Sequence, residues 1–398
     1  MSNTLVNTDL VAREILRIAH EKATFTGTIS RQYDKSYFGR GAKHGSTLRV
    51  ESPNQYSVRS GRVMDVQDQA EATQTITVAT QVGVDMRFNS AELSLNIHDF
   101  SKKYVMPATS VLISSIEGTV LQGCTQSVYN HTGTAGTVPG ASGDTSMIGQ
   151  ARAKLNQGLA PQEDRSLQID SVTMASIVNG DKALFHAGSQ VREAALEGYY
   201  TRAAGLDWYE NERIYVHTNG SDHTTVTLND ASIASGDEAV TMAGGNVTLG
   251  TVFTLGLAGT PVLAVHPETK VAYSHLQQFV ATSAFTTSAT FAPAYITTGA
   301  KQNVNVLPVT GNAVTLFGTA STAYKNALAY HRDFAAFVTA DLPVMADAAE
   351  CTVRQEEGMS VRVWKGSDIR NDELLMRIDV LYGYKVLRPE WACRINCT

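Results

Sequence analysis

One long stretch of helical periodicity constrains the fold of this chain more than any other feature. Between Asp99 and Tyr129, apolar or small side chains recur at steps of three and four residues, at Val105, Thr109, Leu112, Ile116, Val120, Cys124 and Val128. This spacing predicts a single helix with one buried face, and Asp99 or Ser101 can cap its start. At about 1.5 Å per residue the helix would be roughly 40 Å long. A helix of that length is expected to act as the backbone of the fold.

The sequence before this helix predicts a short helix followed by a long β-arm. Thr8–His20 places Val11, Ile15 and Ile18 on one helical face. Two runs of alternating polarity follow. The first includes Leu48 and Val50, and the second, Thr75–Val84, places Ile76, Val78, Val82 and Val84 on one face. Two strands joined by a long polar segment form an arm with little apolar material of its own. Since an isolated two-stranded ribbon is only marginally stable in water, we expect contact with a neighbouring subunit to stabilise the arm.

The arm is basic, although the chain as a whole carries a net charge of −6. Between residues 31 and 62 only Asp34 and Glu51 oppose seven cations, which are Arg31, Lys35, Arg40, Lys43, Arg49, Arg59 and Arg62. We interpret these seven residues as an intersubunit contact that docks on an acidic surface of an adjacent copy. A solvated flexible loop is the plainer alternative. Nucleic-acid contact ranks third, because only Tyr33, Tyr37, Phe38 and Tyr56 could stack on bases and no binding motif surrounds them.

The middle of the chain changes character at Arg213. Before it, Met147–Gly158 predicts a helix, Leu167–Val178 a strand, and Asp181–Tyr200 a partly helical segment. From Arg213 to about Val309 charges nearly vanish and Thr, Ala, Gly and Val dominate. Turn signals there separate four short β-favouring runs, Thr224–Leu228, Val247–Leu255, Pro261–Val265 and Leu276–Ala281. This segment therefore predicts an all-β domain of roughly 100 residues inserted into an α+β fold.

The last quarter of the chain predicts a helix, a strand and a long hairpin. Ser321–His331 fits a helix and Phe334–Thr339 a strand. The hairpin combines Ser360–Trp364, a polar loop over Lys365–Asp372, and a strand over Leu375–Leu387. On the second strand of the hairpin one face carries Met376, Ile378, Val380, Tyr382, Tyr384 and Val386.

No motif in the sequence supports catalysis or a cofactor. Phosphate-loop, dinucleotide, nucleophile-elbow and zinc-protease patterns are all missing, and the glycines of Gly39–Gly45 have the wrong spacing for a nucleotide. Cys393 and Cys397 could offer two thiolates to zinc, but no second pair complements them, so we interpret them as free thiols. His331-Arg332-Asp333 resembles a kinase loop only superficially, and the end of a helix explains it better.

The same sequence argues against membrane insertion and export. No apolar run reaches the roughly 18 to 20 residues that span a bilayer, and the polar N-terminus lacks the apolar core of a leader peptide. We therefore expect no membrane partner and folding in a cytoplasm. The acidic balance also disfavours sequence-specific nucleic-acid binding.

Short runs spread along the chain resemble the major capsid proteins of tailed double-stranded-DNA phages, the HK-97 fold, and within it the P22 coat-protein branch. The matching runs are Val11–Ile18, Met64–Asp68, Asp99–Ala108, Ala203–Tyr209, His217–Gly220, Leu276–Val280, Asn326–Asp333, Arg377–Gly383 and Arg388–Glu390. The resemblance implies a virion shell protein that forms hexamers and pentamers around double-stranded DNA. It also implies a scaffolding protein, a portal protein and possibly a decoration protein. Nothing supports a covalent cross-link through Lys102 or Lys103.

On this resemblance the chain divides into the regions of that family. The expected regions are an N-arm at 1–30, an E-loop at 31–85, a P-domain with its spine helix at 86–180, an A-domain at 181–212 and 310–355, an inserted I-domain at 213–309, and a C-terminal hairpin at 356–398. Within the P-domain, Leu112, Ile116 and Val120 are expected to pack the spine helix on the sheet. The competing classes are a β-rich adhesin or appendage subunit, which the missing export signal disfavours, and a hydrolase with an unrecognised site.

Overall fold

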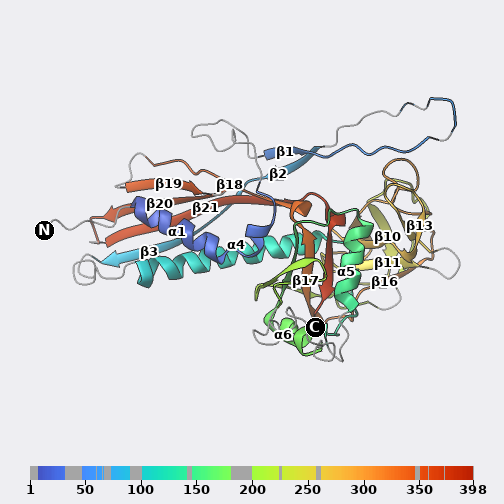
Figure 1. Ribbon diagram of the computed structural model, residues 1–398, viewed down its shortest axis with the longest axis horizontal. Helices are drawn as coiled ribbons and strands as arrows, with labels where there is room; N and C mark the ends of the chain where they lie inside the picture. Colours follow the sequence, from blue (N-terminus) through green and yellow to red (C-terminus); the bar gives the residue numbers. More distant parts are fainter. Residues whose placement is uncertain are drawn as a thin grey trace. The chain divides into compact units, whose positions relative to one another are not determined.

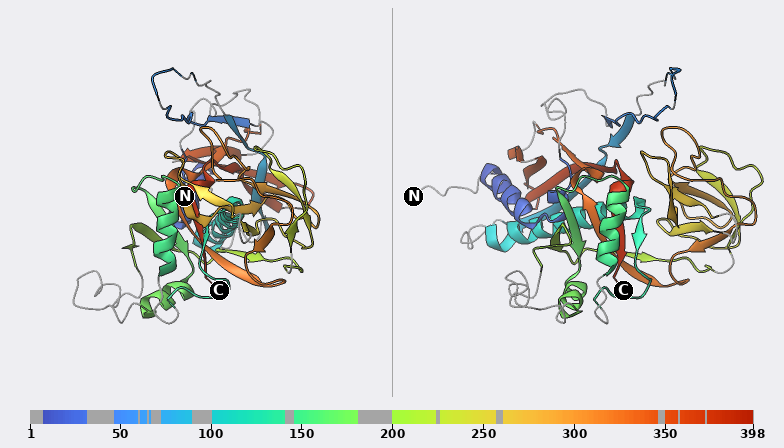
Figure 2. Two further views of the ribbon diagram at one scale, coloured as in Figure 1. Left: turned by 90° about the vertical axis from the view of Figure 1, so that its right-hand side faces the viewer. Right: turned by 45° about the vertical axis from the view of Figure 1, so that its right-hand side comes forward.

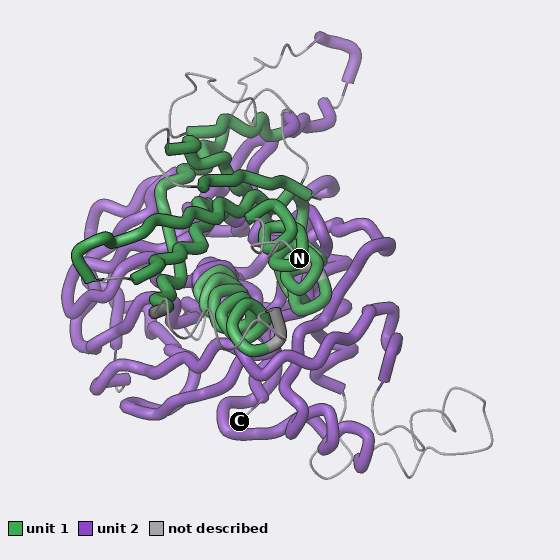
Figure 3. The backbone as a smooth tube through the Cα atoms, turned by 90° about the vertical axis from the view of Figure 1, so that its left-hand side faces the viewer, with its two compact units in different colours: residues 1–52, 73–120, 335–385 green, residues 53–72, 121–334, 386–398 purple. Residues whose placement is uncertain are grey.

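The computed structural model describes residues 8–31, 47–59, 61–64, 66, 73–89, 101–140, 146–180, 200–223, 226–256, 261–345, 350–356, 358–371 and 373–397. The chain forms two compact units, each assembled from three separate segments, and Figure 3 colours them apart. Unit 1 comprises Met1–Ser52, Thr73–Val120 and Ala335–Lys385. Unit 2 comprises Pro53–Ala72, Leu121–Phe334 and Val386–Thr398.

Unit 1 is built on a five-stranded antiparallel sheet (Figure 1). Its strands are β3 (Thr80–Asn89), β18 (Ala335–Ala340), β19 (Glu350–Glu356), β20 (Met359–Asp368) and β21 (Glu373–Val386). β21 is the centre, because it pairs with β18, β20 and β3. The predicted alternation on β21 is confirmed, since Met376, Ile378, Val380 and Tyr382 are each 1% exposed or less.

Two amphipathic helices complete unit 1. Helix α1 (Thr8–Lys22) buries Val11, Ile15 and Ile18 as predicted and packs on β19 and β20, and the short helix α2 (Phe25–Thr28) follows. The predicted long helix is confirmed in its main part as α4 (Met106–Ser127), which a π-helical turn, η2 (Ser101–Val105), precedes. The residues of α4 up to Val120 belong to unit 1, and its last residues, from Leu121, belong to unit 2. Its buried face includes Leu112, Ile116 and Val120, each 2% exposed or less.

Helix α4 bears on the expectation that no segment is long and apolar enough to span a bilayer. Among the described residues, one helical stretch, Lys103–Gln126, is long and apolar enough to cross a bilayer by length and composition. It meets that test because it carries few charges and mixes small residues with large apolar ones, although it is not an unbroken apolar run. The core helix of a soluble protein passes the same test, so this is weak evidence.

Unit 2 contains a seven-stranded sheet of mixed direction. The strand order is β4, β22, β17, β5, β7, β6, and β8 pairs with β17. The strands are β4 (His131–Thr132), β5 (Arg165–Ile169), β6 (Arg202–Ala203), β7 (Leu206–Glu210), β8 (Tyr215–Thr218), β17 (Ala323–His331) and β22 (Ala392–Asn396). Unit 2 also contains helices α5 (Ser146–Gln157) and α6 (Ser171–Gly180). A short 3₁₀ turn, η5 (Arg332–Phe334), follows β17, and another, η6 (Pro389–Trp391), precedes β22. A hydrophobic core that includes Leu155, Leu167, Met174, Ala329 and Ile395 lies against this sheet.

Three predictions in these regions were wrong. Ser321–His331 is not a helix, because its main part is strand β17, which is hydrogen-bonded between β22 and β5. Only the start of Leu167–Val178 is a strand, because helix α6 begins at Ser171. The polar segment Lys365–Asp372 is not a loop throughout, since β20 continues to Asp368 before the chain turns.

The charge-poor segment of unit 2 folds as a closed six-stranded barrel (Figure 2). Its strand order is β10, β15, β14, β11, β16, β9. The six strands are β9 (Thr227–Leu228), β10 (Ala239–Ala243), β11 (Val252–Gly256), β14 (Gln278–Ala281), β15 (Ser288–Ala292) and β16 (Ala313–Leu316), and the hairpin of β12 (Leu263–Val265) and β13 (Ala272–Leu276) adds a separate pair. Phe253, Phe279, Phe291 and Tyr295 fill the barrel core with mutual aromatic contacts. Since β16 closes the barrel, this domain runs past the boundary expected at Val309.

Candidate assembly arm and polar interface

A two-stranded ribbon forms the base of the predicted arm. Strands β1 (Thr47–Glu51) and β2 (Thr73–Thr77) pair antiparallel, with Leu48 opposite Ile76 and Arg49 opposite Thr75. Residues directly opposite in an antiparallel pair share a face. Leu48 and Ile76 therefore lie on the sheltered face of the ribbon, where Ile76 is fully buried, and Arg49 lies on the exposed face. The predicted two-stranded arm is confirmed for β1 and β2. The prediction of a single strand over Thr75–Val84 was wrong, because β2 ends at Thr77 and a separate strand, β3, begins at Thr80 and pairs with β21 in the five-stranded sheet.

The segment that follows β1 exposes large apolar side chains instead of being simply polar. Between residues 56 and 66, the exposed fractions are 58% for Tyr56, 95% for Val58, 84% for Val63, 76% for Met64 and 71% for Val66. Single exposed apolar residues are common on proteins, but five so close in sequence indicate an interaction surface. We call these five residues the apolar tip. Sequence reasoning missed it because the charges of this segment dominated the pattern, although Val63-Met64 was a visible signal.

The seven cations predicted for intersubunit contact differ in their surroundings. Arg49, Arg59 and Arg62 are exposed, and Arg59 donates a hydrogen bond to the Gly61 carbonyl. Arg31 is half-buried, and its Nε donates to the Thr26 carbonyl within helix α2 at 2.7 Å. Lys35, Arg40 and Lys43 lie outside the described residues, as do Gly39–Gly45 and nearly all of Asp181–Tyr200.

Within the described residues no group of histidine, cysteine and acidic side chains could hold a metal ion. Cys393 and Cys397 are both buried in or next to strand β22. Three residues lie between them, and four steps of extended chain span roughly 13 Å, which is too far for two ligands of one zinc ion. Burial raises the pKa of each thiol to about 12, so both thiols stay protonated and unreactive at neutral pH.

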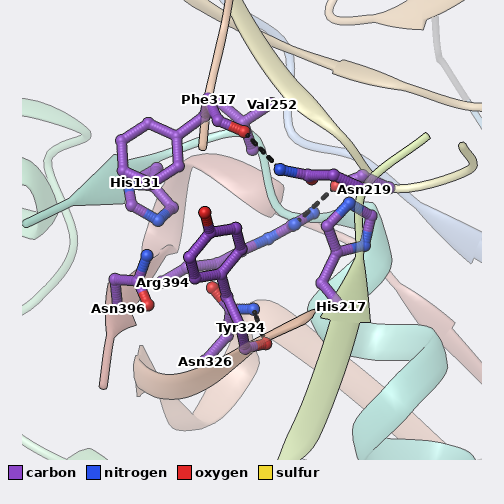
Figure 4. A pocket seen from close by; sticks show the side chains of 10 residues that line it. His131, His217, Asn219, Val252, Phe317, Tyr324, Asn326, Arg394 and Asn396 are labelled. Atoms are coloured by element: carbon purple, nitrogen blue, oxygen red, sulfur yellow. Dashed lines mark hydrogen bonds between the residues drawn. The ribbon is translucent and has the colours of Figure 1, made fainter. Parts of the chain in front are cut away.

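A layer of polar side chains covers the face of the seven-stranded sheet that meets the barrel (Figure 4). β4 contributes His131, β22 Arg394 and Asn396, β17 Tyr324 and Asn326, and β8 His217. Val252 and Phe317 approach from the barrel side, and Asn219 lies just after β8. These residues surround a small cavity of about 10 Å³. The polar layer thus separates the hydrophobic core of the sheet from the hydrophobic core of the barrel.

Arg394 lies in the middle of this polar layer and is only 2% exposed. Its Nη1 donates to the Gly250 carbonyl at 2.6 Å, and its Nη2 donates to the Gln126 carbonyl at 2.8 Å. It makes no ion pair within the described part of the chain. Gly250 precedes barrel strand β11 and Gln126 belongs to helix α4, so one guanidinium group joins the sheet, the barrel and the helix.

Two neighbouring imidazoles continue the network. His217 Nε2 lies 3.1 Å from the Thr251 hydroxyl, and its Nδ1 lies 3.0 Å from the Tyr215 hydroxyl. Burial, helped by the charge of Arg394, lowers the pKa of His217 to about 4 and that of His131 well below its usual value. Burial also lowers the pKa of Arg394 to about 10. At pH 7 both histidines are therefore neutral and Arg394 is the charged group.

Comparison with known proteins identifies a family along nearly the whole chain. The model of the P22 coat protein family, described as gene protein 5, matches residues 28–394. No curated protein sequence matches significantly.

The solved structures that are similar to this chain include several from phages. A chain of Mycobacterium phage Che8 has 11% identity and a TM-score of 0.48, covering 94% of this chain and 90% of that one. The capsid of cyanophage P-SCSP1u gives 12% identity and a TM-score of 0.45, with 94% and 92% covered. The mature capsid of bacteriophage PhiM1 gives 9% identity and a TM-score of 0.43, with 94% and 91% covered.

Proposed function

This chain belongs to the P22 coat protein family, and from that premise we propose that its copies form the hexamers and pentamers of an icosahedral phage head. The chain is a major capsid protein and a structural component of the virion. An adhesin or appendage subunit is not favoured, because the family match covers residues 28–394. We propose no catalytic role.

The observation that carries the proposed assembly mechanism is the exposed apolar tip beyond the β1–β2 ribbon. Its five side chains remain mostly exposed in the single subunit, and Arg49, Arg59 and Arg62 are exposed as well. Burying exposed apolar surface against a neighbour is favourable by about 25 cal/mol per Å². In a symmetric shell every arm meets the same receiving surface, so a modest contact is repeated in every copy. We propose that the tip supplies the apolar contact and that the arginines orient it on an acidic surface.

We propose the following assignment of the family's regions to this chain. Residues 1–30 would form the N-arm, 31–85 the E-loop that carries the tip, and 86–180 the P-domain that contains helix α4. The β-barrel would be the inserted I-domain, extended to include β16 (Ala313–Leu316). The A-domain at 181–212 and 310–355 would supply β6, β7 and β17 of the seven-stranded sheet, and its other strands would come from the neighbouring regions. The contact role of Arg31, Lys35, Arg40 and Lys43 stays a prediction.

The remaining partners follow from the family and the charge of the chain. We propose assembly in the host cytoplasm with a scaffolding protein and a portal protein, and possibly a decoration protein on the finished shell. The net charge of −6 would keep the coat from binding the packaged DNA tightly through its phosphates.

The assembly proposal is tested with two double variants of the arm. Val58→Ser with Val63→Ser removes apolar contact from the tip, and Arg59→Glu with Arg62→Glu reverses its charge. Each should leave the subunit folded by circular dichroism and reduce the yield of closed shells in negative-stain electron microscopy at least tenfold. The control is Val271→Ser, which changes a valine that is 65% exposed elsewhere in the chain and should assemble normally.

The possible outcomes distinguish the role of the tip from the assembly of the shell itself. Normal shells from both arm variants would refute the role of the tip but leave the coat function standing. If the unaltered chain remains monomeric even when expressed with the neighbouring phage genes, assembly into hexamers and pentamers itself would be refuted.

A further inference from the structure

The cavity in the polar layer is lined by buried polar atoms without a hydrogen-bond partner in the described structure. They are both ring nitrogens of His131, both amide atoms of Asn396 and Nε of Arg394. The three side chains are 5%, 1% and 2% exposed. Buried polar groups in folded proteins nearly always have a partner, and leaving one unpaired costs about 1–3 kcal/mol. Three such groups around one cavity indicate a bound species that the protein itself does not supply.

The size of the cavity restricts what that species can be. About 10 Å³ of free space is close to the minimum for a single water molecule or a single atom of similar size. Phosphate, sulfate or a carboxylate-bearing metabolite would need several times this volume. The candidates are therefore water and a monatomic anion.

The charge of the surroundings favours the anion. The protein partners of Arg394 at the cavity are two neutral carbonyl oxygens, those of Gly250 and Gln126. The titratable groups that act on His131 are Arg394 and His217, and those that act on His217 are Arg394 and His223. Those that act on Arg394 are Tyr215 and Cys393, so no carboxylate is among these groups. A buried cation without a counter-charge is costly, and a bound anion would offset that cost.

The available donors match an anion as well. Nε–H of Arg394, the amide nitrogen of Asn396 and the one N–H of a neutral His131 are donors, so the three side chains can supply three hydrogen bonds to one acceptor. The amide oxygen of Asn396 and the second ring nitrogen of His131 are acceptors and would not bind the anion. We propose that the cavity between His131, Arg394 and Asn396 is a binding site for a chloride-sized monovalent anion.

The location of the site gives the anion a structural effect. His131 lies on β4 beside Arg394 on β22, and Arg394 also holds the Gly250 carbonyl at the start of the barrel. An occupied site would hold the barrel against the sheet by completing the hydrogen bonds of this layer. Since a ligand that binds only the folded state stabilises it, unfolding should depend on the anion concentration.

The test compares chloride with gluconate, an anion too large for the cavity, at equal ionic strength on the full-length unassembled chain. We expect the unfolding temperature to be at least about 2 °C higher in chloride. Equilibrium dialysis with radioactive chloride should retain about one ion per chain. Asn396→Leu, which removes a donor and fills the cavity, should abolish both the retained ion and the difference between the two salts.

The matched control is Asn312→Leu. Asn312 is also buried in unit 2 with an unpartnered amide group, but it does not line the cavity. This variant should keep the retained ion and the full salt difference. His131→Phe provides a second cavity variant if Asn396→Leu does not fold.

Two results would overturn the site. The first is equal stability of the unaltered chain in the two salts with no ion retained, which would mean that water fills the cavity. The second is a chloride effect that persists unchanged in the cavity variants, because the anion would then act elsewhere. Neither result bears on the capsid function.

Discussion

Glu117 is the only charged residue in helix α4 and is completely buried. Its Oε1 accepts hydrogen bonds from the Thr26 backbone N–H at 2.8 Å and the Thr26 hydroxyl at 2.6 Å. Its Oε2 accepts from the Phe25 N–H at 3.0 Å and the Thr24 hydroxyl at 3.1 Å. A single carboxylate thus joins the N-terminal segment to the long helix.

We predict that Glu117→Gln destabilises the chain by about 2–3 kcal/mol, because the amide group turns a donor toward buried donors. Urea denaturation of the unassembled protein would measure the loss. Glu21→Gln is the matched control, since the Glu21 side chain is 66% exposed and forms an ion pair with Arg17 at the surface. A loss below about 0.5 kcal/mol in Glu117→Gln would show that the carboxylate does not anchor this segment.

The second prediction at the residue scale concerns His217 and the pH dependence of stability. Its pKa is about 4 in the folded chain and near 6.5 when unfolded, so the unfolded state binds the proton more readily. Its contribution to stability is complete above pH 6.5 and is lost as the pH falls toward 4. The loss should reach up to about 3 kcal/mol, and His131 acts in the same direction.

Urea denaturation at pH 7, 6, 5 and 4.5 tests this, with His217→Asn as the variant. The variant should be less stable at pH 7 but should lose less stability on acidification than the unaltered chain. Identical losses in the two proteins would mean that His217 does not contribute to the acid sensitivity.

At the scale of elements, helix α4 offers a matched pair of substitutions. Ile116 is 1% exposed and Val111 is 66% exposed on the same helix. We predict that Ile116→Ala costs about 2–5 kcal/mol, because it leaves a cavity in the core, and that Val111→Ala changes stability by less than about 0.5 kcal/mol. Equal effects measured by urea denaturation would contradict the assignment of the buried face.

The elements with one buried face were the predictable ones. The stripe through Leu112 and Ile116 and the alternation through Ile378 and Val380 each indicated both the type of element and its buried side, as the structure confirms. Strand β17 lacked such a signal because it lies in the middle of a sheet and is buried on both faces. An apolar run of that kind cannot be told from a buried helix by period alone.

The candidate sites were less predictable for a related reason. The basic residues of the arm were visible as a run of charges, and Arg49, Arg59 and Arg62 proved to be exposed. The polar layer was not visible, because His131, His217 and Arg394 are far apart in sequence and only the pairing of β4, β8, β17 and β22 brings them to one face. No local spacing could have indicated that cluster.

At the scale of the whole molecule, the chain enters the barrel near Asn219 and leaves it near Thr322, and hydrogen bonds link these two segments. Asn219 N donates to the Thr322 carbonyl at 3.0 Å, and Ser321 N donates to the Gly220 carbonyl at 2.8 Å. The entry and exit of the segment therefore lie side by side, which is typical of an inserted domain that can fold alone. Its hydrophobic core, from Val226 to Leu316, is also separate from the core of the seven-stranded sheet.

We predict that an excised fragment of residues 219–322 folds by itself. It should give a sheet-type circular dichroism spectrum and a cooperative thermal transition, because it contains all six barrel strands and their core. The matched comparison is the fragment Arg213–Val309, which lacks β16. Without β16 the barrel opens, β9 and β11 each keep only one neighbouring strand, and the core loses Val314 and Leu316. That fragment should melt without cooperativity. If the two fragments behave alike, closure by β16 does not decide the stability of the barrel, and if neither folds, the barrel depends on the polar layer through which Arg394 holds it to the sheet.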